Sequence, residues 1–385
     1  MTNLPLDTQI AGIRSEFPAT TAVAYLNTGT IGPVPRCVLE RHQALERHFH
    51  FGSPLDMAIE AHVESEFEDT RRRIADLVHS PLCDIALVQN TTDGINAALL
   101  SIGWTSGDQI ITSDAEHSAV NAPLQYLQDR FGVQVTRLAT VQGVLRPEHV
   151  AEAVGPRTRA VVISHASYMT GGVFPVQEIC SLARARGLVT VIDGAQSVGA
   201  IPVNVPGRRC DFYAFSCYKW LVGPEGTAAL YVSNATTYSP YRVSSRASER
   251  LPDGQYKLRQ GARRFEGTGT MNALDFITLG ASIAYVNELG RDQVYERVGL
   301  LCIAFKEGLQ SIPGGRCITP MEPEQSAGLV AFRVDGSNPD ELKERLHAQR
   351  LIIRTVANIG ALRASFHFYN TLDEVSDLLS AIGMA

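Results

Sequence analysis

Short runs of apolar, often β-branched residues alternate along the chain with longer stretches in which apolar residues recur at helical spacing. The short runs predict strands at 85–88, 109–112, 160–164, 188–192, 211–215 and 228–232. Runs of about five residues that each end in a polar turn are typical of strands buried on both faces of a parallel sheet. Helical spacing is clear in segments such as Met57–Val78 and Thr92–Ile102. The alternation predicts an α/β domain with a mostly parallel central sheet and helices on both faces.

The pattern changes after about residue 275. Two long helical stretches, at 272–289 and 291–312, are followed by a strand at 328–334 and a helix at 339–349. Two short strands, at 351–354 and 361–366, and a last helix from Thr371 complete the chain. This order favours a smaller α+β domain. We therefore predict a large domain over 21–275 and a small C-terminal domain over 276–385, which residues 1–20 would complete.

Composition narrows the class of protein. Of the 385 residues, 45% are hydrophobic and 19% are charged, which is ordinary for a soluble globular protein. The net charge of −6 gives no basic footprint for nucleic acid. No signal-peptide pattern opens the chain, and no apolar run reaches the roughly 18 residues of a membrane span. We expect a cytoplasmic protein that binds neither nucleic acid nor membrane.

Cysteine and histidine spacing gives no metal motif. The seven cysteines are odd in number and form no CxxC pair, and the ten histidines form no HExxH cluster. Scattered cysteines of this kind indicate free thiols in a reducing compartment. The sequence therefore predicts no metal site.

Candidate chemistry follows the strand ends, where doubly wound sheets bind ligands. After the strand 85–88 comes Gln89-Asn90-Thr91-Thr92-Asp93-Gly94 and then a helix. Two hydroxyls and free backbone N–H groups at a helix N-terminus can form a phosphate-binding cup. The alternative is that Thr91 or Thr92 is only an N-cap.

An acid ends the strand 188–192. Asp193 would be costly to leave ionised at a buried strand end without a partner. A protonated pyridine nitrogen is a suitable partner, and pairing with it would keep a pyridoxal phosphate (PLP) ring protonated as an electron sink. Gln196 could reach the phenolic oxygen of such a ring. The alternative is that Asp193 caps the following turn.

A lysine follows the strand 211–215, in the segment Ser216-Cys217-Tyr218-Lys219-Trp220. A desolvated lysine near a cation has a lowered pKa and becomes a nucleophile for an aldehyde. Lys219 could therefore hold PLP as a Schiff base, with Trp220 walling the site. A structural lysine whose amine reaches solvent is the alternative. Together, a phosphate cup, a ring acid and an amine at one sheet edge favour a PLP site.

The same segments resemble the class V aminotransferase family of fold-type-I PLP enzymes, which includes cysteine desulfurases, cystine C–S lyases and isopenicillin-N-epimerase-like proteins. The resemblance runs from YLNTGTIGPVP (25–35) to RASFHFYNTLDEV (363–375). Its most specific pieces are VIDGAQSVG, SCYKWLVGPEGTAALYV, RRFEGTGTMN and RASFHFYNT. The resemblance implies the fold-type-I PLP-dependent transferase fold.

The resemblance also implies residue roles. His117 would stack on the PLP ring and Arg363 would clamp the substrate carboxylate, a task suited to a bidentate guanidinium. The phosphate would be bound by Thr91, Thr92 and Ser216. Thr270 would reach the phosphate of a neighbouring subunit, which implies a homodimer; Thr268 is the competing candidate for that contact.

Departures from the family pattern point to a branch within it. Tyr218 stands where many relatives have His, and a phenol can still donate to phosphate without titrating near neutral pH. Tyr168 or Met169 stands where many have Asn. The stretch IIRTVANIGALRAS lacks the nucleophilic cysteine that desulfurases carry there. These features resemble the lyase and epimerase-like branch more than the desulfurases.

We therefore expect a C–S lyase that performs β-elimination on cysteine, cystine or a cysteine S-conjugate, with Lys219, His117 and Asp193 as catalytic residues. An aminotransferase is the alternative, and an amino-acid or peptide epimerase is a third. A protein kept only for binding is disfavoured because the lysine, the acid and the phosphate cup are all present. Cys217 is expected to be a small packing residue. The Arg-rich segment 244–264 could be a lid, a dimer contact or a surface loop.

Overall fold

A seven-stranded sheet forms the centre of the computed structural model, which describes residues 6–52 and 56–384. Neighbouring strands pair in the order β2-β8-β7-β6-β5-β3-β4, and only β8 runs antiparallel to its neighbours. Their bounds are β2 (Ile85–Val88), β3 (Gln109–Ser113), β4 (Gln134–Leu138), β5 (Thr158–Ser164), β6 (Val189–Asp193), β7 (Phe212–Ser216) and β8 (Ala228–Val232). The expected mostly parallel α/β sheet is confirmed.

The sequence pattern missed β4. This strand lies at the sheet edge and reads QVTRL, with its residues half-buried or exposed. An edge strand packs on one neighbour only, so it needs no continuous apolar run. The inner strands β7 and β8 are buried at every position, as their apolar runs predict.

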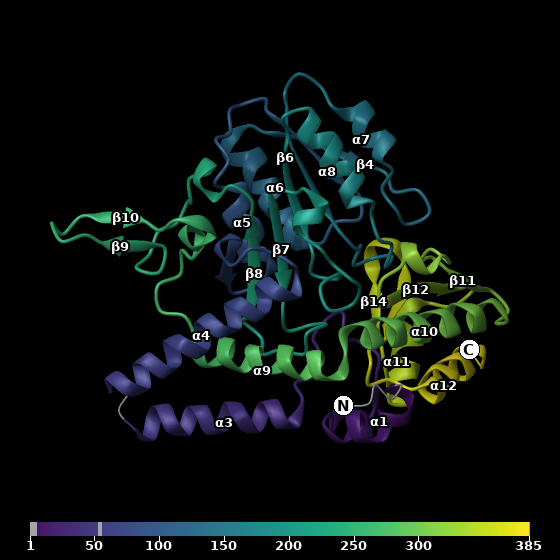
Figure 1. Ribbon diagram of the computed structural model, residues 1–385. Helices are drawn as coiled ribbons and strands as arrows, with labels where there is room; N and C mark the ends of the chain where they lie inside the picture. Colours follow the sequence, from purple (N-terminus) through teal and green to yellow (C-terminus); the bar gives the residue numbers. More distant parts are fainter. Residues whose placement is uncertain (1–5, 53–55, 385) are drawn as a thin grey trace.

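Helices cover both faces of the sheet (Figure 1). On one face, α5 (Thr91–Leu99) and α6 (Ser118–Phe131) bury residues such as Ile95 and Leu124 against alternate strand residues. On the other face lie α4 (Met57–Leu77), α7 (Pro147–Ala153), α8 (Val176–Ala185) and α9 (Ala273–Leu289), and the last also packs on α3 (Arg36–Phe51). The two apolar layers make the core that holds the strand ends in place.

A second, four-stranded antiparallel sheet lies beside this body, in the order β11-β12-β15-β14. Its strands are β11 (Gly315–Cys317), β12 (Leu329–Val334), β14 (Arg354–Val356) and β15 (Ala361–Ser365). Three helices pack with it, namely α10 (Arg291–Gln310), α11 (Pro339–Ala348) and α12 (Leu372–Gly383). Figure 1 shows β14 on the side of this sheet that faces the large domain, and β15 pairs with β14.

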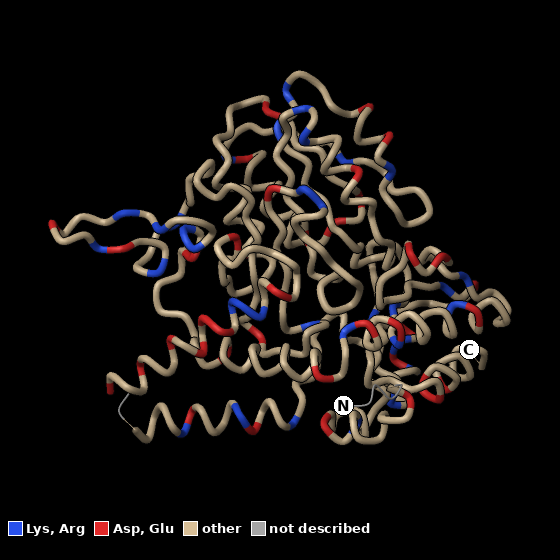
Figure 2. The backbone as a smooth tube through the Cα atoms, in the orientation of Figure 1, with Lys and Arg blue, Asp and Glu red and all other residues tan. Residues whose placement is uncertain are grey.

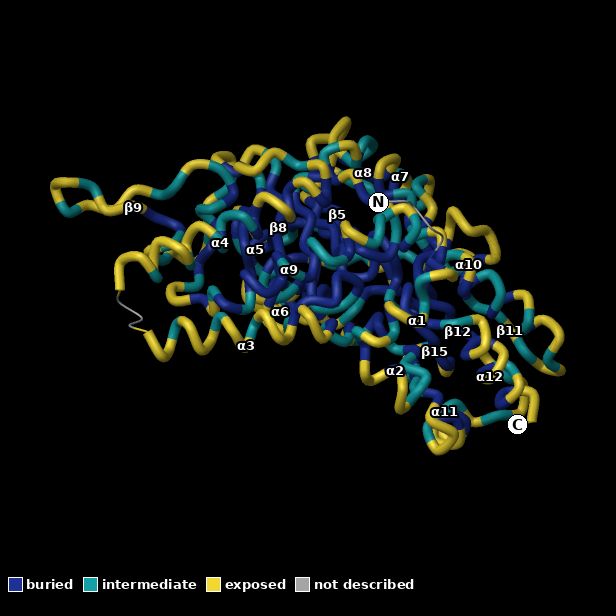
Figure 3. Tube along the Cα trace, turned by 60° about the horizontal axis from the view of Figure 1, so that its bottom comes forward, coloured by how far each residue is buried: buried dark blue, intermediate teal, exposed yellow. Residues whose placement is uncertain are grey.

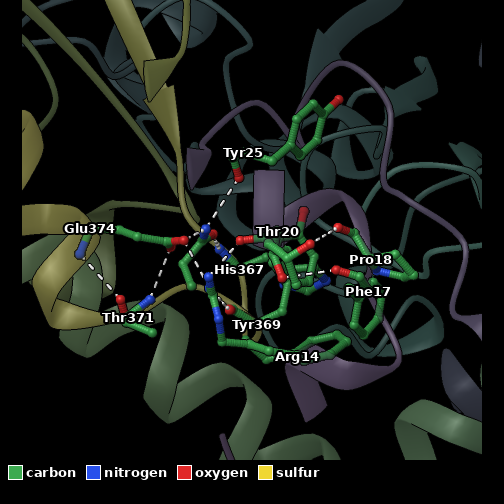
Figure 4. A network of polar contacts seen from close by, with 12 residues as sticks. Arg14, Phe17, Pro18, Thr20, Tyr25, His367, Tyr369, Thr371 and Glu374 are labelled. Carbon is green, nitrogen blue, oxygen red and sulfur yellow. Dashed lines mark hydrogen bonds and ion pairs between the residues drawn. The ribbon is translucent and has the colours of Figure 1, made fainter. Parts of the chain in front are cut away.

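The N-terminal segment packs against the C-terminal part of the chain. It comprises α1 (Leu6–Ser15), α2 (Ala19–Ala22) and β1 (Ala24–Tyr25), and β1 pairs in parallel with β13 (Leu351–Ile352). Arg14 donates to the Tyr369 carbonyl (2.9 Å), to Glu374 (2.8 Å) and to the Thr20 carbonyl (2.7 Å), as Figure 4 shows. Residues 1–5 lie outside the described part of the chain, and the domain limits at 275 and 276 stay a prediction.

The Arg-rich segment 244–264 contains a hairpin. Strands β9 (Ser248–Arg250) and β10 (Tyr256–Leu258) pair antiparallel and project from the body (Figure 1). Charges of both signs lie along it (Figure 2), and most of it is exposed (Figure 3). At its base, the Arg246 guanidinium lies 4.2 Å from the centre of the Phe67 ring.

None of the described helices is long and apolar enough to cross a membrane.

Candidate active site

A cavity of about 400 Å³ opens at the carboxyl ends of β5, β6 and β7 and at the start of α5. Every residue predicted to bind the cofactor lines it, with the exception of Thr270. The lining residues are Asn90, Thr91, Thr92, His117, Ala119, Ser164, Ala166, Tyr168, Asp193, Ala195, Gln196, Ser216, Tyr218 and Lys219. The tertiary structure thus brings the strand-end residues together, as expected for a doubly wound sheet.

The predicted phosphate cup lies at the N-terminus of α5. The N-cap is Asn90, whose side-chain oxygen accepts from the Asp93 amide at 2.9 Å. Capping by Thr91 or Thr92 is therefore wrong as an alternative. The Thr91 hydroxyl instead lies 2.6 Å from the Ser216 hydroxyl, which links the helix start to the end of β7. Both residues line the cavity, and a helix N-terminus of this kind offers N–H groups suited to an anion.

Asp193 ends β6 and is 5% exposed. Burial raises the pKa of its carboxyl, while the Ala195 amide and Lys219 act in the opposite direction. One carboxylate oxygen, Oδ1, accepts from the Ala195 amide at 2.9 Å, so Asp193 does cap its turn. No described residue donates to Oδ2, which leaves this oxygen for a cationic N–H in the cavity.

Lys219 follows β7 and its amine makes no hydrogen bond or ion pair with any described residue. Burial lowers the pKa of this amine to about 8; Asp193 raises it, and Arg363 and Arg354 lower it further. A reactive amine with a lowered pKa is the state that the sequence predicts.

The backbone around Lys219 is tightly held. The Gly32 amide donates to the Tyr218 carbonyl at 2.8 Å, and a Cβ at Gly32 would overlap the Lys219 carbonyl oxygen. Val222 has a φ of 48°, which is a strained conformation for a β-branched residue. The chain therefore tolerates strain in the turn that presents the lysine.

His117 begins α6, and its Nδ1 accepts from the Ala119 amide at 3.1 Å. Burial, and then Lys219, Arg354 and Arg363, lower the pKa of its imidazole to about 4. A neutral ring whose Nδ1 accepts carries its proton on Nε2. The ring stands edge-on to Tyr168, with 4.8 Å between the ring centres. Tyr168 lines the cavity, whereas Met169 is buried in the core.

Sequence reasoning missed Glu116, the residue before His117. Its carboxylate accepts from the Ser113 hydroxyl at the end of β3, and from the Ser164 amide (3.1 Å) and hydroxyl (2.6 Å) at the end of β5. Burial raises the pKa of this carboxyl to about 7. Glu116 thus ties two strand ends together below His117. The sequence gives no local signal for this role, because Ser164 is 48 residues from Glu116 along the chain.

Gln196 lines the cavity, but its amide is already engaged. Its Nε2 donates to the Gly29 carbonyl at 2.9 Å, and its Oε1 accepts from Trp220 Nε1 at 3.0 Å. Trp220 is fully buried and does not line the cavity. The expectation that Trp220 walls the site is therefore wrong; its indole holds Gln196 in place instead.

Two arginines from the small sheet lie near enough to act on the charge of Lys219, although neither is among the residues that line the cavity. Arg363 is buried and donates to the Tyr168 carbonyl (2.7 Å) and to the Thr30 hydroxyl (3.3 Å). Arg354 lies directly across from it on β14 and donates to the same Thr30 hydroxyl at 3.2 Å. The sequence predicted Arg363 alone; Arg354 has no local signal, because cross-strand pairing places it.

The remaining predicted residues differ in placement. Tyr218 lines the cavity. Thr270 is exposed and Thr268 accepts from Arg242 at 3.2 Å, and neither lines the cavity of its own chain. Their predicted contact with a neighbouring subunit stays a prediction.

Cys217 is fully buried among core residues, and burial raises the pKa of its thiol. No cysteine lines the cavity.

This set of groups fits PLP. The hydroxyls at the start of α5 suit its phosphate, Asp193 Oδ2 suits a protonated ring nitrogen, the neutral imidazole of His117 suits the ring face, and the free amine of Lys219 suits its aldehyde. Among the described residues, no group of three His, Cys, Asp or Glu side chains lies close enough together to hold a metal ion.

Comparison with known proteins agrees with this geometry. The model of the family "Aminotransferase class-V" matches residues 24–378. Isopenicillin N epimerase of Streptomyces clavuligerus is 30% identical over 94% of both chains, and a cysteine desulfurase of Salmonella agona is 30% identical over 96% of both. The solved cystine C–S lyase C-DES has a TM-score of 0.90 and 27% identity over 95% of this chain and 99% of its own. The chain therefore belongs to the class V aminotransferase family and is a PLP-dependent enzyme.

Proposed function

We propose that this enzyme is a C–S lyase that performs β-elimination on cysteine, cystine or a cysteine S-conjugate. The observation that carries the proposal is that none of the described cysteines lines the cavity. A desulfurase must take sulfur onto a cysteine thiolate near the substrate. Here Cys217 is buried in the core and Cys317 lies on β11, at the far edge of the small sheet from β14. Sulfur would therefore leave in the product.

The side chains divide the work of elimination. When bound, PLP supplies an electron sink for the charge that develops at the substrate α-carbon. The Lys219 amine removes the α-proton, and its pKa of about 8 keeps a useful fraction unprotonated near neutral pH. Asp193 keeps the pyridine nitrogen protonated, and Arg363 holds the α-carboxylate. The C–S bond then breaks, and the sulfur group leaves with the bonding electron pair. Hydrolysis of the remaining aminoacrylate yields pyruvate and ammonia.

Product analysis tests the proposal. Holoenzyme incubated with L-cysteine, L-cystine or cysteine S-conjugates should form pyruvate without 2-oxoglutarate, and Lys219→Ala should abolish this. Glutamate formed only when 2-oxoglutarate is added would instead establish an aminotransferase. The similarity to isopenicillin N epimerase makes inversion without either product the third outcome. A persulfide on Cys217 or Cys317 by mass spectrometry would overturn the lyase in favour of a desulfurase.

We also propose that the enzyme is a cytoplasmic homodimer. The exposure of Thr270 supports a phosphate contact to a neighbouring subunit, and the projecting β9–β10 hairpin offers a further contact surface. The seven cysteines are all free thiols, which supports a reducing compartment. Sedimentation at working concentration tests the dimer, and cell fractionation tests the compartment.

A further inference from the structure

A second cavity, of about 610 Å³, lies next to the end of β5. Ser164 and Ala166 line the catalytic cavity, whereas His165, between them, lines the second one. The side chain of His165 thus points to the other side of the strand end, as alternate side chains along an extended chain do. The two cavities share no lining residue. The second cavity is therefore a separate site and not an extension of the catalytic one.

Apolar side chains form walls of the second cavity. Leu145, before α7, and Phe174, before α8, are almost fully buried, and Ile201, after β6, lines the cavity with them. The segment 323–326, between β11 and β12, lines the cavity from the side of the small sheet. A volume of this size and walls of this kind are typical of small-molecule sites, which enclose roughly 300–1,000 Å³.

Arg208 is a cation in this lining that lacks a partner. Its side chain is half-buried, and its Nε is buried without a hydrogen-bond partner among the described residues. Arg246, Arg263 and Arg363 also have such an Nε, but each forms an ion pair or donates a hydrogen bond to another residue. Arg208 does neither with any described residue. A bound anion would supply the acceptors that this guanidinium lacks.

His165 supplies a second donor to the same cavity. It is 1% exposed, and its Nδ1 lies 2.7 Å from the Tyr213 hydroxyl. A phenol O–H is a better donor than a neutral imidazole N–H, so the hydroxyl donates to Nδ1 and the ring proton lies on Nε2. No described residue accepts from Nε2. Burial, and then Arg208, lower the pKa of the imidazole to about 3, which keeps the ring neutral and indicates that the two side chains lie close together.

The exposed part of the lining is acidic. Glu148, Glu178 and Glu324 all line the cavity and are exposed, against the single exposed arginine Arg146. Three carboxylates at the mouth repel a second negative charge at the outer end of a ligand, whereas the two inner donors attract one negative charge. The cavity therefore suits a ligand that carries one negative charge on an apolar chain.

We propose that this second cavity binds a monocarboxylate with an apolar chain, whose carboxylate accepts from Arg208 and from His165 Nε2. The planar fork of a guanidinium matches the two oxygens of a carboxylate. The apolar walls suit the chain, and the acidic mouth disfavours dicarboxylates and phosphates. Since 323–326 forms one wall, the ligand would also contact the part of the chain that builds the small sheet. The site does not depend on the reaction at Lys219.

Calorimetry with hexanoate, hexanamide and adipate tests the ligand class. Wild-type holoenzyme should bind hexanoate at least tenfold more tightly than hexanamide, since a charge-assisted hydrogen bond discriminates by that amount. It should also bind hexanoate more tightly than the dicarboxylate adipate. Arg208→Gln should abolish the gap between acid and amide, and Arg208→Lys should keep part of it, because lysine retains the charge without the fork. Equal binding of hexanoate and hexanamide, or of hexanoate and adipate, by wild-type enzyme would overturn the proposal.

Two further variants locate the ligand. Arg209 is exposed and lines neither cavity, so Arg209→Gln removes the same charge next to Arg208 and should leave hexanoate affinity unchanged. Arg363→Gln removes the predicted carboxylate clamp of the catalytic cavity and should leave it unchanged as well. Hexanoate affinity that falls in Arg363→Gln but not in Arg208→Gln would place the ligand in the catalytic cavity and refute the second site. Urea unfolding without ligand checks that Arg208→Gln folds, and hexanoate should raise the midpoint of wild type but not of this variant.

Discussion

At the scale of single residues, the site depends on groups whose burial changes their protonation. Asp193, Lys219 and His117 lie at three different strand or helix ends, and burial is the first cause of each pKa shift. The shifts favour a free amine and a neutral imidazole in one cavity. Burial alone would also favour a protonated Asp193, so its ionised form depends on a cationic partner. A protonated ring nitrogen would supply such a partner, in addition to Lys219.

Asp193→Asn separates the role of this charge from its role in the turn. Asn can still accept from the Ala195 amide through Oδ1, so the urea midpoint of unfolding should stay close to that of wild type. Removal of the substrate α-proton should slow by roughly 100-fold, about 3 kcal/mol, because the ring nitrogen loses its counter-charge. Exchange of that proton in deuterated water measures the step. Unchanged exchange in a normally folded variant would show that Asp193 does not pair with the ring.

At the scale of elements, the segments that carry site residues are fixed by caps and short loops. Asn90 caps α5 and His117 caps α6, so the N-termini of both helices are fixed where the predicted phosphate-binding and ring-stacking residues line the cavity. At the C-terminal end of the chain, Thr371 and Glu374 form a capping box at the start of α12. Glu374 also pairs with Arg14 from α1, so this cap joins the two ends of the chain.

Thr371→Ala should destabilise the protein by about 1 kcal/mol, the usual cost of losing an N-cap. The Thr371 hydroxyl accepts from the Glu374 amide at 3.1 Å, and alanine leaves that donor without its partner. Thr371→Ser keeps the hydroxyl and is the matched control. Urea unfolding of the three proteins measures the difference. Equal stability of the alanine and serine variants would show that the cap contributes nothing.

At the scale of the whole molecule, the fold keeps neutral histidines where solvent does not reach. His165 lies fully buried at the end of β5, with Nδ1 2.7 Å from the Tyr213 hydroxyl, and burial, then Arg208, lower its pKa to about 3. The unfolded chain takes up a proton near pH 6.5 at this residue, whereas the folded chain does not. Between about pH 6.5 and pH 3 the unfolded state thus binds more protons, so this group destabilises the fold as pH falls.

His165→Gln should reduce this pH dependence. The slope of unfolding free energy against pH should decrease between pH 6 and pH 4 by up to about 1.4 kcal/mol per pH unit, the linkage value of one proton. Buried Glu116 has a raised pKa and acts in the opposite direction, so the comparison is between slopes of variant and wild type. Urea titrations across this range measure both. Parallel slopes would mean that His165 takes up a proton in the folded protein.

The sequence by itself determined the strands of the sheet centre, the α/β class, the family and the residues that follow each strand, because these depend on local apolar runs and on short motifs such as VIDGAQSVG. It could not determine what depends on distant pairing. Edge strand β4 lacks an apolar run, and β8 is antiparallel to both of its neighbours although its sequence resembles those of the parallel strands. Glu116 matters because β3 and β5 end side by side, and Arg354 matters because β14 pairs with β15. Both are long-range contacts, and only the tertiary structure sets the burial and the charge that neighbouring strands impose on each other.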